Sequence, residues 1–224
     1  MKKYLLLAVP SIFFNSLVGD IKSYPEPYNQ LEEILPFKQT IGVYYSNGAE
    51  IEQIFNTHKI ITALEVGSFL GTGSTAHIGR LLKSQENARF FAVDHWLGSY
   101  NHQLGGTAYD PILPKLYDQF LSNIIHQELA HIVIPVQMES VDASKFLNEM
   151  FDFIYIDAEH LEEFVYNDLV AWYPHLNSDG VFCGDDWGTS IDVRNAVIRF
   201  ANENNLKIFT GSNFWRLLKI NEEL

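Results

Sequence analysis

Cysteine is almost absent from this sequence, since Cys183 is the only one in 224 residues. A single thiol excludes an intrachain disulfide framework and a zinc site built from several cysteines. The metal ligands that the chain can offer are therefore oxygen and nitrogen atoms. With 47% apolar side chains, the chain is long and apolar enough for the core of one globular domain, which excludes a disordered chain.

Basic residues are also few, with 15 Lys and Arg against 28 Asp and Glu and a formal net charge of −13. Non-specific affinity for nucleic acid comes from Lys and Arg that displace counterions from the phosphate backbone. The composition therefore disfavours a nucleic-acid partner. Eleven of the acids lie between residues 146 and 193, a segment without Lys or Arg, and this excess of negative charge suits a pocket for a cation.

No run of apolar residues is long enough to span a bilayer, because spanning takes roughly 20 of them. Two lysines precede an apolar stretch over residues 5–14, which is the layout of a secretory signal, although no small-residue cleavage pattern follows it. The alternative is a packed N-terminal helix, which Pro10 disfavours. The sequence predicts a signal-like or apolar N-terminal segment over residues 1–23.

Prolines separate this segment from the rest of the chain. Three of the eight prolines lie between residues 25 and 36, and each one lacks a backbone donor and restricts the residue before it. Residues 24–48 are therefore expected to form an arm or linker. Residues 49–224 are expected to form the single folded domain.

Helical and strand patterns alternate through this domain. Strands are predicted over residues 60–66, 90–94, 132–136, 153–157, 180–185, 206–210 and 214–220, and helices over 49–58, 74–83, 116–129, 161–172 and 191–204. Such alternation predicts a mostly parallel sheet covered on both faces. The last two strands are joined by a short turn and must pair antiparallel. The expected fold is α/β, a Rossmann-like, doubly wound, seven-stranded sheet that ends in an antiparallel β-hairpin.

A glycine-rich turn follows the first predicted strand, over residues 65–74 (Glu-Val-Gly-Ser-Phe-Leu-Gly-Thr-Gly-Ser). Glycines at the carboxyl end of a strand allow a ligand to approach the backbone closely. The turn differs from G-x-G-x-x-G, because the residue three beyond Gly73 is Ala76. Asp94 ends the second strand 21 residues after Gly73, where an acid that accepts from ribose hydroxyls is expected. The alternative is that the glycines only form a tight turn.

Two further strand ends are acidic, at Asp157 and at the pair Asp185 and Asp186. One helix crossover fits between them, so the two strands can be neighbours with adjacent carboxyl ends. Like charges about 4 Å apart repel by about 4 kcal/mol at an effective dielectric near 20, so such a group needs a cation or a shared proton. Oxygen ligands favour a hard divalent ion, Mg²⁺ first. The alternative is that these acids only cap a helix and end a strand.

Together, these motifs resemble the class I S-adenosylmethionine-dependent methyltransferases, and the resemblance extends over residues 51–220. It implies that Glu65 lies near the methionine amino group and that Asp94 accepts from the ribose hydroxyls. Ser140 is a contact on the adenine side by this resemblance alone. The residues that the resemblance assigns to the cofactor are Glu65, Gly67, Ser68, Gly71, Gly73, Ser74, Asp94, His95, Ser140 and Asp157.

The acidic strand ends are similar to those of metal-dependent small-molecule O-methyltransferases that modify sugars, in which Ile-Asp-Gly-Asp and a later Asp-Asp pair hold Mg²⁺. Residues 153–187 look most like a domain-24-like branch of class I methyltransferases. The sequence has Ala158 and Glu159 where the sugar enzymes have Gly and Asp. The resemblance implies Mg²⁺ ligation by three residues, Asp157, Asp185 and Asp186. Glu159 and His160 are the candidates for the catalytic base.

The expected function is transfer of the methyl group of S-adenosylmethionine to a hydroxyl of a small molecule, assisted by Mg²⁺. One alternative is a metal-dependent glycosyltransferase that uses a nucleotide sugar, which the glycine-rich turn and the closing hairpin disfavour. Another is a non-catalytic domain that binds the cofactor. The sequence is compatible with a homo-oligomer. It predicts no single localisation, because the signal-like segment favours export whereas the cofactor favours the cytoplasm.

Overall fold

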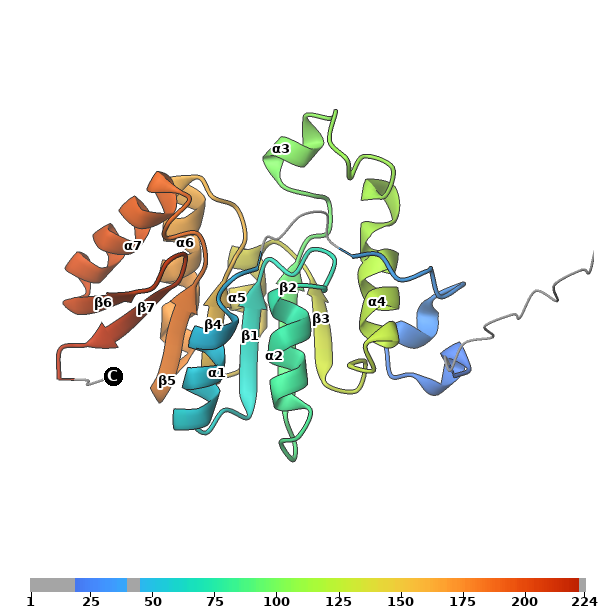
Figure 1. Cartoon of the computed structure of the whole chain (residues 1–224), viewed down its shortest axis with the longest axis horizontal. Coiled ribbons are helices and arrows are strands. Elements are labelled where there is room, and N and C mark those ends of the chain that lie inside the picture. The colour runs from blue at the N-terminus through green and yellow to red at the C-terminus, as the bar shows by residue number, and fades with distance from the viewer. Residues whose placement is uncertain (1–18, 40–44, 222–224) are drawn as a thin grey trace, which may run out of the picture.

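The computed structural model describes residues 19–39 and 45–221. The apolar stretch on which the predicted signal depends lies outside these residues. The described chain forms a seven-stranded sheet in the order β3-β2-β1-β4-β5-β7-β6 (Figure 1). The strands are β1 (Thr62–Val66), β2 (Arg89–Asp94), β3 (Val133–Gln137), β4 (Phe151–Ile156), β5 (Leu176–Gly184), β6 (Leu206–Thr210) and β7 (Trp215–Lys219). Strands β1 to β5 pair in parallel, and β7 pairs antiparallel with both β5 and β6, which confirms the predicted fold.

Helices cover both faces of the sheet. They are α1 (Gly48–Thr57), α2 (Ser74–Leu82), α3 (Tyr100–Gln103), α4 (Leu116–His126), α5 (Ser140–Phe146), α6 (Glu162–Trp172) and α7 (Ile191–Glu203), with short 3₁₀ turns at Ile21–Ser23, Tyr28–Gln30, Leu113–Lys115 and Tyr173–His175. Buried residues of α1, α2 and α4 form one apolar cluster, and those of α5, α6 and α7 form a second. Successive residues of β1 belong to different clusters, Ala63 to the first and Leu64 to the second, because side chains alternate between the faces of a strand.

The described part of the proline-containing arm packs on the domain. Tyr28 is fully buried, and its hydroxyl donates to the carbonyl of Val133 on the edge strand β3 (2.8 Å). Further along, Asn123 of α4 exchanges two hydrogen bonds with the backbone of Lys38. The arm therefore runs beside α4 toward the start of α1. None of the helices in the described residues is long and apolar enough to cross a membrane.

Candidate functional site

The carboxyl ends of β1 and β4 meet in a close backbone contact. Gly67 has φ +92°, and a Cβ at this position would overlap the carbonyl oxygen of Asp157. Gly71 has φ +67°, and a Cβ there would lie 2.9 Å from side-chain atoms of Phe120 and Ile124. Both glycines are thus required by the packing of the chain itself, so their presence alone does not imply a ligand.

Glu65 is the buried acid of the glycine-rich turn. Its Oε2 accepts from the hydroxyls of Ser68 (2.9 Å) and Thr75 (2.5 Å), whereas its Oε1 is buried without a hydrogen-bond partner among the described residues. Burial raises the pKa of Glu65 to about 7, and the hydroxyls of Ser74, Thr75 and Ser68 offset part of that rise. An orphaned buried acceptor is costly unless a ligand supplies the donor.

Asp94 connects the end of β2 to the glycine-rich turn. Its Oδ2 accepts from the backbone N–H groups of Ser68 (3.1 Å) and Phe69 (2.9 Å), and its Oδ1 accepts from that of Trp96 (2.7 Å). A carboxylate has roughly four acceptor positions, so one remains at Oδ1 for a ligand hydroxyl. His95 lies beside this carboxylate and is partly exposed. The structure therefore places Glu65, Ser68 and Asp94 around one turn.

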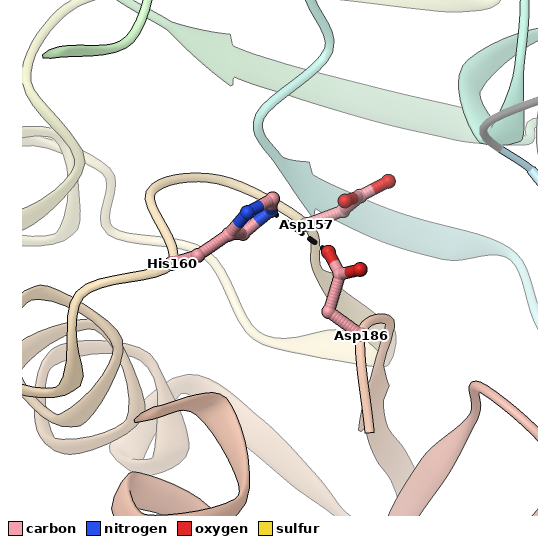
Figure 2. A group of neighbouring side chains, drawn as sticks. All are labelled: Asp157, His160 and Asp186. Carbon is pink, nitrogen blue, oxygen red and sulfur yellow. Dashed lines mark ion pairs between the residues drawn. The ribbon is translucent and has the colours of Figure 1, made fainter. Parts of the chain in front are cut away.

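Three side chains converge at the ends of β4 and β5, namely Asp157, His160 and Asp186 (Figure 2). Their ligand atoms all lie within 4.8 Å of one another, and His160 Nε2 is 2.8 Å from Asp186 Oδ2. Burial, together with the neighbouring carboxylates Asp185, Asp186 and Glu65, raises the pKa of Asp157 well above its ordinary value. The hydrogen bond to Asp186 raises the pKa of His160. The group combines two carboxyl groups with one imidazole.

Asp185, which was predicted to ligate a cation together with Asp157 and Asp186, has a different environment. It is 3% exposed, and its Oδ1 accepts from Asn47 Nδ2 (2.9 Å), Asn213 Nδ2 (2.5 Å) and the backbone N–H of Asp186 (2.7 Å). It lies outside the group of three that could hold a metal ion. Asp185 instead connects the arm, the sheet and the turn of the terminal hairpin.

Sequence reasoning missed Asn47 and Asn213 because no local pattern marks them. Asn47 is buried and donates to the hydroxyl of Tyr155 (3.0 Å) as well as to Asp185. It lies within the range expected to be a linker, immediately before α1. Tyr45, two residues earlier, is hydrogen-bonded to His77 of α2, and its pKa is raised by burial and by Glu65 and Asp185. The end of the arm therefore lines the same edge of the sheet.

The sequence matches the family model described as a methyltransferase domain over residues 64–187, more than half of the chain. This chain belongs to the methyltransferase domain family. The matched range begins in β1 and ends just beyond β5, so it contains the glycine-rich turn and both acidic strand ends. No curated protein matches the sequence.

Solved structures resemble this methyltransferase domain in fold. The O-methyltransferase NovP has a TM-score of 0.59 at 14% identity, over 77% of this chain and 79% of its own. TomG from Streptomyces achromogenes, an O-methyltransferase solved with SAM, has a TM-score of 0.56 at 14% identity, and the match covers 80% of this chain and 83% of TomG. An O-methyltransferase from Bacillus cereus, solved with SAH, has a TM-score of 0.53 at 18% identity, and the match covers 83% of this chain and 84% of that enzyme. At these identities the likeness concerns the fold.

The remaining candidate residues, Ser74, Ser140 and Glu159, lie at the starts of two helices and beside the acidic group. Ser74 is buried in the first turn of α2, directly after Gly73. Ser140 begins α5, and its hydroxyl oxygen accepts from Trp172 Nε1 (2.9 Å). Glu159 Oε1 accepts from the backbone N–H of His160 (2.9 Å). Ser140 thus has a structural partner in α6, whereas Glu159 adjoins the acidic group.

Replacing Asn47 by alanine is expected to lower the free energy of unfolding by about 2 kcal/mol, because a hydrogen bond to a buried charged group contributes roughly 1.5–3 kcal/mol. Urea unfolding followed by circular dichroism measures the change. Asn202→Ala makes the same chemical change at an exposed position in α7 and is the matched control. Equal stability of Asn47→Ala and the wild type would contradict the role of this contact.

Proposed function

We propose that this protein transfers the methyl group of S-adenosylmethionine to a hydroxyl group of a small-molecule acceptor, assisted by a divalent cation. The observation that supports cofactor binding is the orphaned Oε1 of Glu65, buried at the end of β1 in a chain of the methyltransferase family. The amino group of the cofactor's methionine part would supply the missing donor. That two O-methyltransferases of similar fold were solved with SAM or SAH supports this choice of ligand.

The chain's own residues fit the rest of such a ligand. Asp94 holds the glycine-rich turn through the N–H groups of Ser68 and Phe69, and its remaining acceptor position suits a ribose hydroxyl. His95, Gly71, Gly73 and Ser74 belong to the same turn or to the end of β2. These residues position the cofactor, so that the methyl group can be aligned with the acceptor oxygen.

The group of Asp157, His160 and Asp186 suits a divalent cation, because its carboxylates and imidazole are metal-ligand types that converge on one point. A bound cation would orient an acceptor hydroxyl and lower its pKa. Glu159 and His160 both line the small pocket between the ends of β4 and β5 and are the candidates to accept the hydroxyl proton, His160 only where its imidazole does not ligate the cation.

The segment between β2 and α4 is the proposed acceptor loop. It contains α3 and projects above the edge at which β1 and β2 end (Figure 1). The ring of His102 stacks on Phe69 of the glycine-rich turn, with centroids 5.1 Å apart, and Tyr109 packs against Phe69 edge-on. This loop is therefore attached to the cofactor turn, where it can form a wall for the acceptor.

Calorimetric titration with S-adenosylmethionine and S-adenosylhomocysteine in EDTA tests cofactor binding, with a nucleotide sugar as the control ligand. We expect binding of the first two only. If neither S-adenosylmethionine nor S-adenosylhomocysteine binds, the proposal is overturned. Binding of the nucleotide sugar alone would support the glycosyltransferase alternative, which family membership does not favour.

Chelation is expected to abolish methyl transfer and to leave the affinity for S-adenosylmethionine within about twofold, because Glu65 is not one of the three residues whose ligand atoms converge on the cation. Transfer to a panel of phenols, catechols and sugars is measured before and after EDTA treatment, and after a divalent ion is restored. Asp157→Asn should behave like chelation. Full transfer in EDTA would exclude the cation from the mechanism.

A further inference from the structure

We propose that Asp157, His160 and Asp186 form the cation site of this protein, and that His160 makes the site prefer a divalent transition-metal ion such as Mn²⁺ over Mg²⁺. The inference deepens the proposed function, on which the role of the ion rests. Binding of the ion itself can be measured without the cofactor or an acceptor.

The spacing of the three side chains fits a first-row divalent ion. Metal–ligand bonds of about 2.1 Å put neighbouring ligand atoms of an octahedron about 3.0 Å apart and opposite ones about 4.2 Å apart. His160 Nε2 and Asp186 Oδ2 are 2.8 Å apart, and no pair in the group exceeds 4.8 Å. A bound ion would replace the contact between His160 and Asp186, with Asp157 as the third ligand.

The Oδ1 of Asp185 is not available as the third ligand atom. Three donors already converge on its Oδ1, two of them side-chain amides from Asn47 and Asn213. Ligation through this oxygen would break hydrogen bonds to a carboxylate that is 3% exposed, and each such bond is among the stronger ones in a protein. The third ligand beside Asp157 and Asp186 is therefore the imidazole nitrogen of His160 rather than a carboxylate oxygen of Asp185.

The surroundings favour a bound cation. The pocket between these strand ends has a volume of about 10 Å³ and is lined by Asp157, Glu159, His160, Asp185 and Asp186. This is the space of about one water molecule, and it is also the scale of an ion. Residues 146–193 contribute no Lys or Arg to neutralise these acids. The side chain of His160 is 54% exposed, so the site is open to a further ligand from solvent.

An imidazole changes which ion the site prefers. Mg²⁺ takes oxygen ligands and keeps several waters, whereas Mn²⁺, Fe²⁺, Co²⁺ and Zn²⁺ accept nitrogen as well. Two carboxylates and one histidine therefore favour the transition ions, and three protein ligands leave positions for an acceptor oxygen. With the imidazole committed to the ion, Glu159 is the remaining base candidate in this pocket.

Titration with Mn²⁺, followed through the electron paramagnetic resonance signal of the free ion, measures binding to the protein without cofactor. Mg²⁺ is then added as the competitor. We expect His160→Ala to weaken Mn²⁺ binding at least tenfold. We expect His160→Asp, which creates an all-oxygen set, to lower the preference for Mn²⁺ over Mg²⁺ at least tenfold. His131→Asp makes the same chemical change at an exposed position on another part of the domain and should leave both affinities unchanged.

Two outcomes would overturn the inference. One is that the wild type fails to retain Mn²⁺. The other is that His160→Ala binds Mn²⁺ like the wild type while Asp185→Asn loses it, with both variants folded by circular dichroism; the ligands would then be the three aspartates predicted from the sequence. The affinity for S-adenosylmethionine in EDTA, measured on the same proteins, tests the proposed function separately, because loss of cofactor binding does not alter the Mn²⁺ result.

Discussion

Replacing Glu65 by glutamine is expected to weaken S-adenosylmethionine binding about 100-fold at pH 8. The carboxylate is fully buried, and its Oε1 has no donor among the described residues, so the ligand's ammonium group would form a buried ion pair with it. Breaking such a pair by removing one partner costs about 3 kcal/mol or more, which corresponds to at least two orders of magnitude in affinity. Calorimetry measures the dissociation constant, and Glu86→Gln, at an exposed position after α2, is the matched control.

The same carboxylate predicts a pH dependence. The pKa of Glu65 is raised to about 7 from 4.5, so the unliganded fold favours the protonated form and loses stability as the pH rises from about 4.5 to 7. The ligand's ammonium group favours the ionised form, so affinity should fall as the pH drops below 7. Between pH 7 and 5.5 the ionised fraction falls from about one half to about 3%, and the affinity should decrease by the same factor, about 15-fold. Glu65→Gln should show no such decrease, and a wild type with constant affinity would contradict the assignment.

Gly67→Ala is expected to destabilise the fold by about 4 kcal/mol, a large part of the 5–15 kcal/mol that is typical of a domain. The residue has φ +92°, which only glycine adopts readily, and an added Cβ would overlap the carbonyl oxygen of Asp157. The overlapping atom belongs to the backbone immediately after β4, where the N–H of Asp157 donates to the carbonyl of Val66 at the end of β1, so it cannot rotate away as a side chain could. Urea unfolding measures the loss.

Gly106→Ala separates the two causes of this loss. Gly106 also has a positive φ, +80°, but a Cβ there meets nothing within 4 Å. Its replacement should therefore cost only about 1 kcal/mol, the price of the backbone conformation. The difference between the two variants reports the close approach of β1 and β4. Similar losses for both would show that the approach contributes nothing.

Most of the sheet could be predicted, because buried strands have a local pattern. The predicted range 206–210 coincides with β6, and the other strands differ from their predicted ranges by a few residues at the ends. Helix α5 was not predicted, because it has seven residues, two of them serines, and no clear apolar periodicity. It is stabilised by tertiary contacts such as the hydrogen bond between Trp172 and Ser140, which a local pattern does not reveal.

The acidic strand ends could be located from the sequence, because parallel strands share an edge and each acid directly follows its strand. The sequence could not show which of these acids would point into the cation group and which would be held by hydrogen bonds within the fold. Asp185 differs from Asp186 because two asparagines donate to it, from 138 residues before and 28 residues after. His160 was predicted as a base candidate, and only the geometry shows its contact with Asp186. Single-sequence patterns report spacing along the chain, whereas these roles depend on contacts across the fold.

The three groups that donate hydrogen bonds to Asp185 come from different parts of the chain, before and after it. Strands β1 to β5 and the arm precede residue 185 along the chain, whereas Asn213 follows it by 28 residues, in the turn between β6 and β7. The domain can therefore collapse around its parallel strands while this carboxylate lacks one of its donors. Long-range closure of this kind is slow compared with helix formation. The hydrogen bond from Asn213 can therefore form only after the parallel strands have been made, so the surroundings of Asp185 are the last part of this edge that the chain can complete.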